Sequence, residues 1–158
     1  MMREGQIRIP SGCAIAAVIS KEGNRMDGSG IIEAMKPMHE RPNALGGGFA
    51  GYGIYPEYKD FYALHIFYDD ATSRHACELF LKDSFEIVHD ERIPTRTIPA
   101  ITGEPIIRRY FVAPLKSLLS SLQVDEREYV ARVVMKINTQ ITGAYVFSSG
   151  KNMGCFKA

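Results

Sequence analysis

The chain has 158 residues and a formal net charge of +1, with 46% hydrophobic and 23% charged residues. This length suits one domain or one and a half, and the composition is ordinary for a soluble globular protein. The near-neutral charge gives no reason to expect nucleic acid or a membrane as a partner. Three cysteines without CxxC spacing indicate neither a disulfide framework nor a zinc site, and they favour a reducing, cytoplasmic location.

The first segment, residues 1–12, is a polar leader without the apolar stretch of an export signal. Cys13–Ser20 is a short apolar run, which predicts a buried strand with the Cys13 thiol at its tip. Two interpretations stay open for this thiol. It is either a nucleophile that a substrate can reach or a buried cysteine that packs as a small hydrophobic side chain.

A short helix is expected next, capped by Ser29 and made to kink or stop near Lys36 by Pro37. Gly46, Gly48 and Gly51 then match GxGxxG. A dinucleotide-binding loop should follow a strand and open a helix, whereas this segment leads into an alternating aromatic strand. The glycines therefore predict a close backbone approach within a sheet, and the strand is expected to form a hairpin with a central strand at Phe61–Tyr68.

From residue 61 onward the elements follow the order β-α-β-β-α-β, the split βαβ arrangement of ferredoxin-like domains. Asp70 opens the first helix, and Asp125 with Glu128 opens the second through a capping-box pattern. The strands are expected at Phe61–Tyr68, Phe85–Ile93, Ile106–Val112 and Ala144–Phe147. A turn at 148–152 leads into a strand that begins and does not finish, which suggests a fragment of a larger protein. The fold class is therefore α+β.

The remaining polar residues give no strong site. Four histidines lack metal-binding spacing and are interpreted as structural or solvated, so no metal site is expected. They are His39, His65, His75 and His89. Arg108 and Arg109 are interpreted as one exposed charge and one edge charge. Five tyrosines form an aromatic patch that packing explains, namely Tyr52, Tyr55, Tyr58, Tyr62 and Tyr68.

Two stretches together resemble a known family, and a third fits the same subfamily. They are SGCAIAAVI at residues 11–19, HERPNALGGGFAGYGIYP at residues 39–56 and YVFSSGKNMG at residues 145–154. These stretches resemble the class II glutamine amidotransferase domain, and most closely that of archaeal-type glutamate synthase. The match runs with gaps over most of the chain, and the glycine segment is its most specific part.

The resemblance implies an N-terminal-nucleophile (Ntn) hydrolase fold of layered sheets and helices. In this family the cysteine becomes the first residue of the mature chain and attacks the side-chain amide of glutamine. The resemblance therefore assigns Cys13 as the nucleophile and requires removal of residues 1–12, so that the free α-amino group, with a pKa of roughly 7.7–8.0, can act as base. The substrate-binding residues stay unassigned.

The expected partner is a synthase domain or subunit, which uses the released ammonia. In this family that synthase half carries FMN and iron–sulfur clusters, and nothing in these residues is expected to bind either. Ala14 and Pro42 stand where the family has glycine, and the family's substrate-carboxylate and oxyanion-hole segments are absent. Little activity is therefore expected of the chain alone.

The expected organisation is a leader at 1–12, the start of an amidotransferase domain at 13–60, the β-α-β-β-α-β segment at 61–148 and a truncated hairpin at 149–158. An alternative of a different class is a non-catalytic ligand-binding or assembly module built on the ferredoxin-like segment. In that alternative Cys13 is a buried strand residue, and its replacement lowers stability without affecting a reaction.

Overall fold

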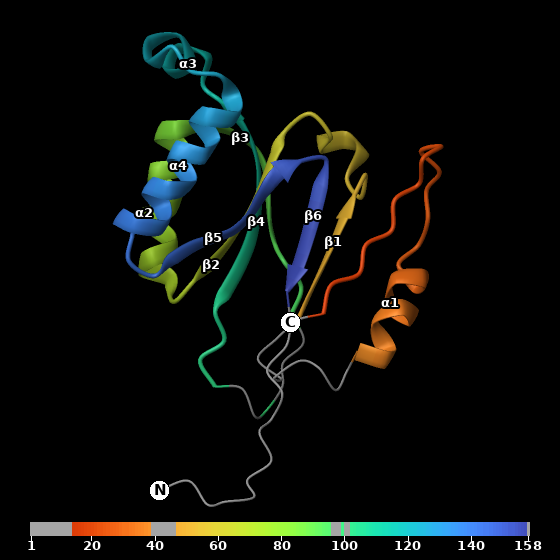
Figure 1. Ribbon diagram of the computed structural model, residues 1–158. Helices are drawn as coiled ribbons and strands as arrows, with labels where there is room; N and C mark the ends of the chain where they lie inside the picture. Colours follow the sequence, from red (N-terminus) through yellow and green to blue (C-terminus); the bar gives the residue numbers. More distant parts are fainter. Residues whose placement is uncertain (1–13, 39–46, 96–98, 100–101, 158) are drawn as a thin grey trace, which may run out of the picture. The chain divides into compact units, whose positions relative to one another are not determined.

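A computed structural model describes residues 14–38, 47–95, 99 and 102–157 (Figure 1). The chain divides into two compact units. One comprises Phe49–Phe156, and the other comprises Met1–Gly48 with Lys157–Ala158. All the strands belong wholly or mainly to the first of these units.

In the N-terminal unit, helix α1 (Ser29–Met35) passes into a 3₁₀ turn η1 (Lys36–Met38), as Pro37 predicts. Gly28 is the N-cap, and Ser29 is the first helical residue. The buried strand expected at 13–20 is wrong for residues 14–20, which have no regular structure. Ile15 and Ile19 there are 92% and 88% exposed. A strand needs hydrogen-bonding partners, and no strand of the described ranges pairs with this segment. Cys13 itself lies outside the described residues.

The larger unit is built on a four-stranded antiparallel sheet with the order β3-β4-β2-β5. Its strands are β2 (Tyr62–Tyr68), β3 (Phe85–Arg92), β4 (Ile106–Pro114) and β5 (Ala144–Lys151). Helix α2 (Ala71–Ser84) joins β2 to β3, and α4 (Glu126–Gln140) precedes β5. This confirms the element order expected from residue 61 onward and the central position of β2. The short helix α3 (Lys116–Leu122) was not predicted.

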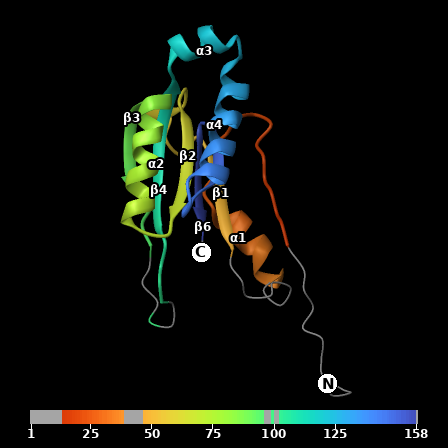
Figure 2. The same ribbon diagram turned by 90° about the vertical axis from the view of Figure 1, so that its left-hand side faces the viewer.

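Helices α2 and α4 cover one face of this sheet (Figures 1 and 2). Both begin as the sequence predicts. The Asp70 carboxylate accepts a hydrogen bond from Ser73 N at 2.7 Å, and the Asp125 carboxylate accepts one from Glu128 N at 2.8 Å. Four residues of α4 are buried, and they pack against the sheet: Tyr129, Val130, Val133 and Ile137. The main core therefore lies between these helices and alternate residues of β2 and β4.

A second, two-stranded sheet of β1 (Gly48–Tyr52) and β6 (Met153–Lys157) packs on the opposite face (Figure 1). The hairpin predicted between the glycine-rich strand and β2 is therefore wrong. Both edges of β2 are already paired, with β4 and β5, and the 3₁₀ turn η2 (Pro56–Tyr58) leads the chain from one sheet to the other. The contact at Gly51 is with side chains and not with another backbone: a Cβ there would lie 2.7 Å from Ile54 Cδ1.

Among the described residues of 149–158, the expected hairpin is not formed, because β5 and β6 do not pair with each other. Strand β5 continues to Lys151, and only Asn152, at a φ of 56°, separates it from β6. Strand β6 then pairs with β1, while β5 stays in the four-stranded sheet. The chain thus crosses between sheets at one residue. Within the described ranges, no helix is both long and apolar enough to span a membrane.

Candidate functional site

The sequence assigns chemistry to Cys13, which lies outside the described residues, so the structure gives no geometry for it. Cys77 lies on the buried face of α2, and burial raises the pKa of its thiol to about 11. It is therefore an enclosed thiol that stays protonated at neutral pH, which does not favour a role as nucleophile. Cys155 is half-buried in β6, and its main-chain groups make the polar contacts described next.

A buried polar cluster lies between the two sheets, and we call it the intersheet cluster. It consists of Tyr55, His65, Glu91, Arg109 and Cys155. The antiparallel register places Glu91 of β3 opposite Arg109 of β4, and Arg109 opposite His65 of β2. Because side chains alternate along each strand, three neighbouring strands present this row to the β1–β6 sheet.

Arg109 is the centre of the cluster and is 0% exposed. Its Nε donates to His65 Nε2 at 2.9 Å, its Nη2 donates to the Cys155 carbonyl at 3.3 Å, and its Nη1 bonds the Tyr55 hydroxyl and pairs with the Glu91 carboxylate. Its guanidinium carbon also lies 4.9 Å from the centre of the Phe156 ring. A buried charge is tolerated only when it is paired and hydrogen-bonded, and this guanidinium has both kinds of partner.

His65 is equally buried, at 0% exposure. Its Nε2 accepts hydrogen bonds from Arg109 Nε and, at 3.0 Å, from the Cys155 amide. Burial lowers the pKa of His65, and the nearby charge of Arg109 lowers it further, to about 4. A hydrogen bond with the Ser148 backbone and the charge of Glu91 raise it by smaller amounts. The ring is therefore neutral at pH 7, with its proton on Nδ1 because Nε2 is the acceptor.

The intersheet cluster links strands β2, β3 and β4 to β6 through side-chain hydrogen bonds. The Nε2 lone pair of His65 is already shared by two donors and is closed off from solvent, so it cannot serve as a general base without first losing a contact. The Arg109 guanidinium is likewise committed to four protein groups. The cluster therefore positions β6 and the segment after β1, and any chemistry must use groups outside it.

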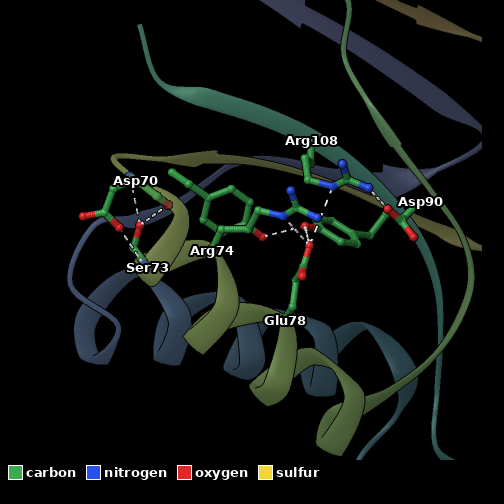
Figure 3. A network of polar contacts seen from close by, with 8 residues as sticks. Asp70, Ser73, Arg74, Glu78, Asp90 and Arg108 are labelled. Atoms are coloured by element: carbon green, nitrogen blue, oxygen red, sulfur yellow. Dashed lines mark hydrogen bonds and ion pairs between the residues drawn. The ribbon is translucent and has the colours of Figure 1, made fainter. Parts of the chain in front are cut away.

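A second polar network lies on the helix side of the same sheet (Figure 3). The Tyr68 hydroxyl donates to the Tyr110 hydroxyl at 3.0 Å, which in turn donates to the Glu78 carboxylate at 2.8 Å. Arg74 Nε, one turn earlier on α2, lies 2.7 Å from the same carboxylate. Arg108 Nε lies 3.7 Å from it and the Arg108 guanidinium also pairs with Asp90. Helix α2 is thus tied to β4 through Glu78.

The pKa values of this network follow from burial and pairing. Burial raises the pKa of Tyr68 and of Tyr110, so both remain protonated donors. Burial also acts to raise the pKa of Glu78, but hydrogen bonds from Arg74 and Tyr110 outweigh that effect and lower it. The carboxylate therefore stays ionised, and it accepts the hydrogen bonds that hold α2 in place.

Several expectations about single polar residues are corrected here. Arg108 and Arg109 are not one exposed and one edge charge: β4 is an inner strand, Arg109 is fully buried, and the Arg108 side chain is 14% exposed on the opposite face. The two arginines serve separate networks because neighbouring strand residues point to opposite faces.

The five tyrosines do not form a single patch. Tyr62 and Tyr68 belong to the helix-side core, Tyr55 and Tyr58 to the intersheet core, and Tyr52 is 76% exposed.

The histidines are scattered, as expected from their spacing. His89 stacks on Tyr58 with ring centres 5.0 Å apart, His75 is exposed on α2, and His65 is buried in the intersheet cluster. His39 lies outside the described residues. Within the described part of the chain, no group of three or more His, Cys, Asp or Glu residues could hold a metal ion.

A surface hollow of about 700 Å³ lies among helices α2, α3 and α4. The side chains that line it include Phe80, Leu118, Leu122, Arg132 and Lys136. Glu128 of the predicted helix cap is among its lining residues.

Comparison with known proteins assigns no activity. No family model matches the chain. Over 147 residues, or 92% of the chain, it is 45% identical to an uncharacterized protein of Archaeoglobus fulgidus. The match covers 39% of that protein, so the chain spans about two fifths of the length of this relative.

Proposed function

We propose that the chain is the N-terminal part of a class II glutamine amidotransferase domain with Cys13 as its nucleophile. The observation that carries the proposal is the pairing of β1 with β6. Strand β1 comes from the resembling segment at 39–56, and β6 begins in the resembling segment at 145–154. Their sheet packs on the four-stranded sheet opposite the helices, and layered sheets are what the resemblance implies.

The proposed reaction is the hydrolysis of the glutamine side-chain amide. After removal of residues 1–12, the α-amino group of Cys13 takes the thiol proton, and the thiolate attacks the amide carbon. A C–S bond forms, the C–N bond breaks, and ammonia leaves with the proton. Water then cleaves the thioester, which releases glutamate and restores the thiol. Without the processing step the Cys13 nitrogen is an amide and cannot act as a base.

The proposal places the chain in the cytoplasm with a synthase domain or subunit of glutamate synthase as its partner. That partner would hold FMN and iron–sulfur clusters and would use the ammonia. The resemblance carries this assignment, and it applies to the whole protein. The contribution proposed for these residues is the nucleophile and the sheets that position it.

The test is the intact mass of the longest polypeptide that carries these residues, before and after incubation with an electrophilic glutamine analogue. We expect a chain that begins at Cys13 and gains one adduct. Cys155→Ala should still be labelled, because only main-chain atoms of Cys155 make its polar contacts. Cys13→Ala should retain residues 1–12 and gain no adduct. An unlabelled wild-type chain that still begins at Met1 would overturn the proposal.

A second candidate is a non-catalytic ligand-binding or assembly module. The sheet order β3-β4-β2-β5 with two covering helices favours it, since this is the arrangement of the split βαβ unit. In this case Cys13→Ala changes stability and no reaction. The same labelling experiment therefore separates the two candidates.

A further inference from the structure

The peptide groups of Cys155 are held by side chains of the opposite sheet. His65 accepts a hydrogen bond from the Cys155 N–H at 3.0 Å, and Arg109 donates one to the Cys155 carbonyl at 3.3 Å. A main-chain N–H and C=O are normally satisfied by a neighbouring strand, and here two side chains take that role. These two polar contacts join Cys155 of β6 to the four-stranded sheet, beside the apolar packing of Met153 on Ala63 and Phe111.

Two hydrogen bonds in the intersheet cluster depend on the protonation state of His65: the one donated by the Cys155 amide and the one donated by Arg109 Nε. An imidazolium carries hydrogen on both nitrogens, so Nε2 could no longer accept from the Cys155 amide or from Arg109 Nε. It would also bring a second positive charge against the buried guanidinium. Protonation therefore removes two hydrogen bonds and adds like-charge repulsion.

The groups around His65 do not offset that charge. From β4 it faces the Arg109 cation, from β5 the Phe147 ring at 5.9 Å and the Ser148 backbone, and from β6 the Cys155 amide. Glu91 of β3 is the carboxylate in the cluster, and it pairs with Arg109. An added proton on His65 thus has no anionic partner in direct contact within the described residues.

The two cores differ greatly in size, so the β1–β6 side can open by itself. Among the described residues, the helix-side core contains fifteen buried residues, whereas the intersheet core contains three, Ala63, Phe111 and Met153. Regions with few buried apolar contacts open at a lower free energy than the global unfolding reaction. Loss of the polar attachment should therefore release β6 before α2, α4 and the four-stranded sheet unfold.

We propose that His65 and Arg109 form an acid-sensitive latch, which holds β6 and its partner β1 on the four-stranded sheet and releases them when His65 gains a proton. The inference stands on the contacts of the intersheet cluster and is independent of the proposed enzymatic function. It makes the position of the second sheet dependent on pH, while the helix-covered sheet remains folded.

The experiment is amide hydrogen exchange followed by NMR on the full chain, with protection factors calculated at each pH between 7 and 4. The Cys155 amide reports on the latch, and the Gly53 amide, which donates to the Asn152 carbonyl at 2.8 Å, reports on the β1–β6 sheet. Since His65 has a pKa of about 4 when folded and 6.5 when released, we expect both protection factors to fall by about a hundredfold over this range. Amides of α4 should stay better protected at every pH.

The matched variants are His65→Gln and His75→Gln. A glutamine amide oxygen can accept from the Arg109 and Cys155 donors but cannot gain a proton, so His65→Gln should remove the pH dependence at Cys155. His75 is exposed on α2, and its variant should behave as the wild type. An equal pH response of Cys155 in His65→Gln and in the wild type would overturn the latch.

A second measurement keeps the test decisive if His65→Gln does not fold. The ¹⁵N shifts of the His65 ring in the wild-type protein report its titration directly. The latch requires the ring titration and the loss of Cys155 protection to share one midpoint. Separate midpoints, or equal protection of Cys155 and the α4 amides at every pH, would contradict it.

Discussion

Replacing Arg109 tests whether the intersheet cluster stabilises the fold. In Arg109→Met the side chain keeps much of its length but loses its charge and its four hydrogen-bond partners. The Cys155 carbonyl and the Tyr55 hydroxyl then lack a donor, and Glu91 lacks its cation. Removing one partner of a buried ion pair typically costs about 3–5 kcal/mol. Because Glu91, the charge left behind, is 32% exposed, water offsets part of this cost, and we expect a loss at the lower end of that range, about 3 kcal/mol, in the free energy of unfolding.

The matched control applies the same substitution to a surface ion pair. Arg132 Nε lies 2.7 Å from the Glu128 carboxylate one turn away on α4, and the two side chains are 55% and 53% exposed. Such pairs contribute about 0.3–0.5 kcal/mol, so Arg132→Met should be nearly neutral. Both variants lose an arginine, so the difference between their free energies of unfolding reports the effect of burial.

The measurement is urea denaturation followed by far-ultraviolet circular dichroism, with the free energy of unfolding extrapolated to zero denaturant. Wild type, Arg109→Met and Arg132→Met are compared in one buffer at pH 7. The reasoning is refuted if Arg109→Met loses less than about 1 kcal/mol, which is the scale of an ordinary neutral hydrogen bond. In that case the hydrogen bonds and the ion pair of Arg109 would hardly exceed the cost of removing its charge from water.

Two further predictions concern pH and a glycine. The folded pKa of His65, about 4, is below its unfolded value of 6.5, so its contribution to stability is complete above about pH 6.5 and is lost as the pH falls to about 4. The wild type should lose about 3 kcal/mol more than His65→Gln over this interval in urea titrations, and equal losses would exclude the depressed pKa. Gly143 has a φ of +80°, and a Cβ there would lie 2.9 Å from Ser73 Cβ, so Gly143→Ala should cost about 1–3 kcal/mol. Gly103→Ala, at a φ of +74° with nothing within 4 Å, should cost less, and equal thermal shifts would show that the Ser73 contact does not matter.

Local sequence signals predicted the helix-covered sheet well. Asp70 and Asp125 mark the starts of α2 and α4, and the apolar spacing of α4 identifies the face that packs on the sheet. These features depend on neighbours within a few residues, so the sequence contains them directly. Helix α3 lacks them: Leu115 is its N-cap and makes no side-chain cap hydrogen bond, and no residue of the helix is buried.

The pairing of β1 with β6 could not be predicted from local pattern. An alternating strand followed by a turn and a second strand indicates a hairpin, and that reasoning paired β1 with β2. The true partner of β1 comes about a hundred residues later along the chain.

The intersheet cluster was missed for a related reason. Only the register that places Glu91, Arg109 and His65 in one row brings those residues together.

The position of that cluster bears on the choice between the two candidate functions. In a split βαβ module the helices cover one face of the sheet, and the other face is available for a ligand. Here the second face carries Arg109 and His65 at 0% exposure beneath the β1–β6 sheet. A ligand could reach that face only after the second sheet had moved away. Because this face is covered, it does not offer the free surface that a split βαβ module would use to bind a ligand. The covered face favours a layered domain, in which the two sheets together support a site outside the intersheet cluster.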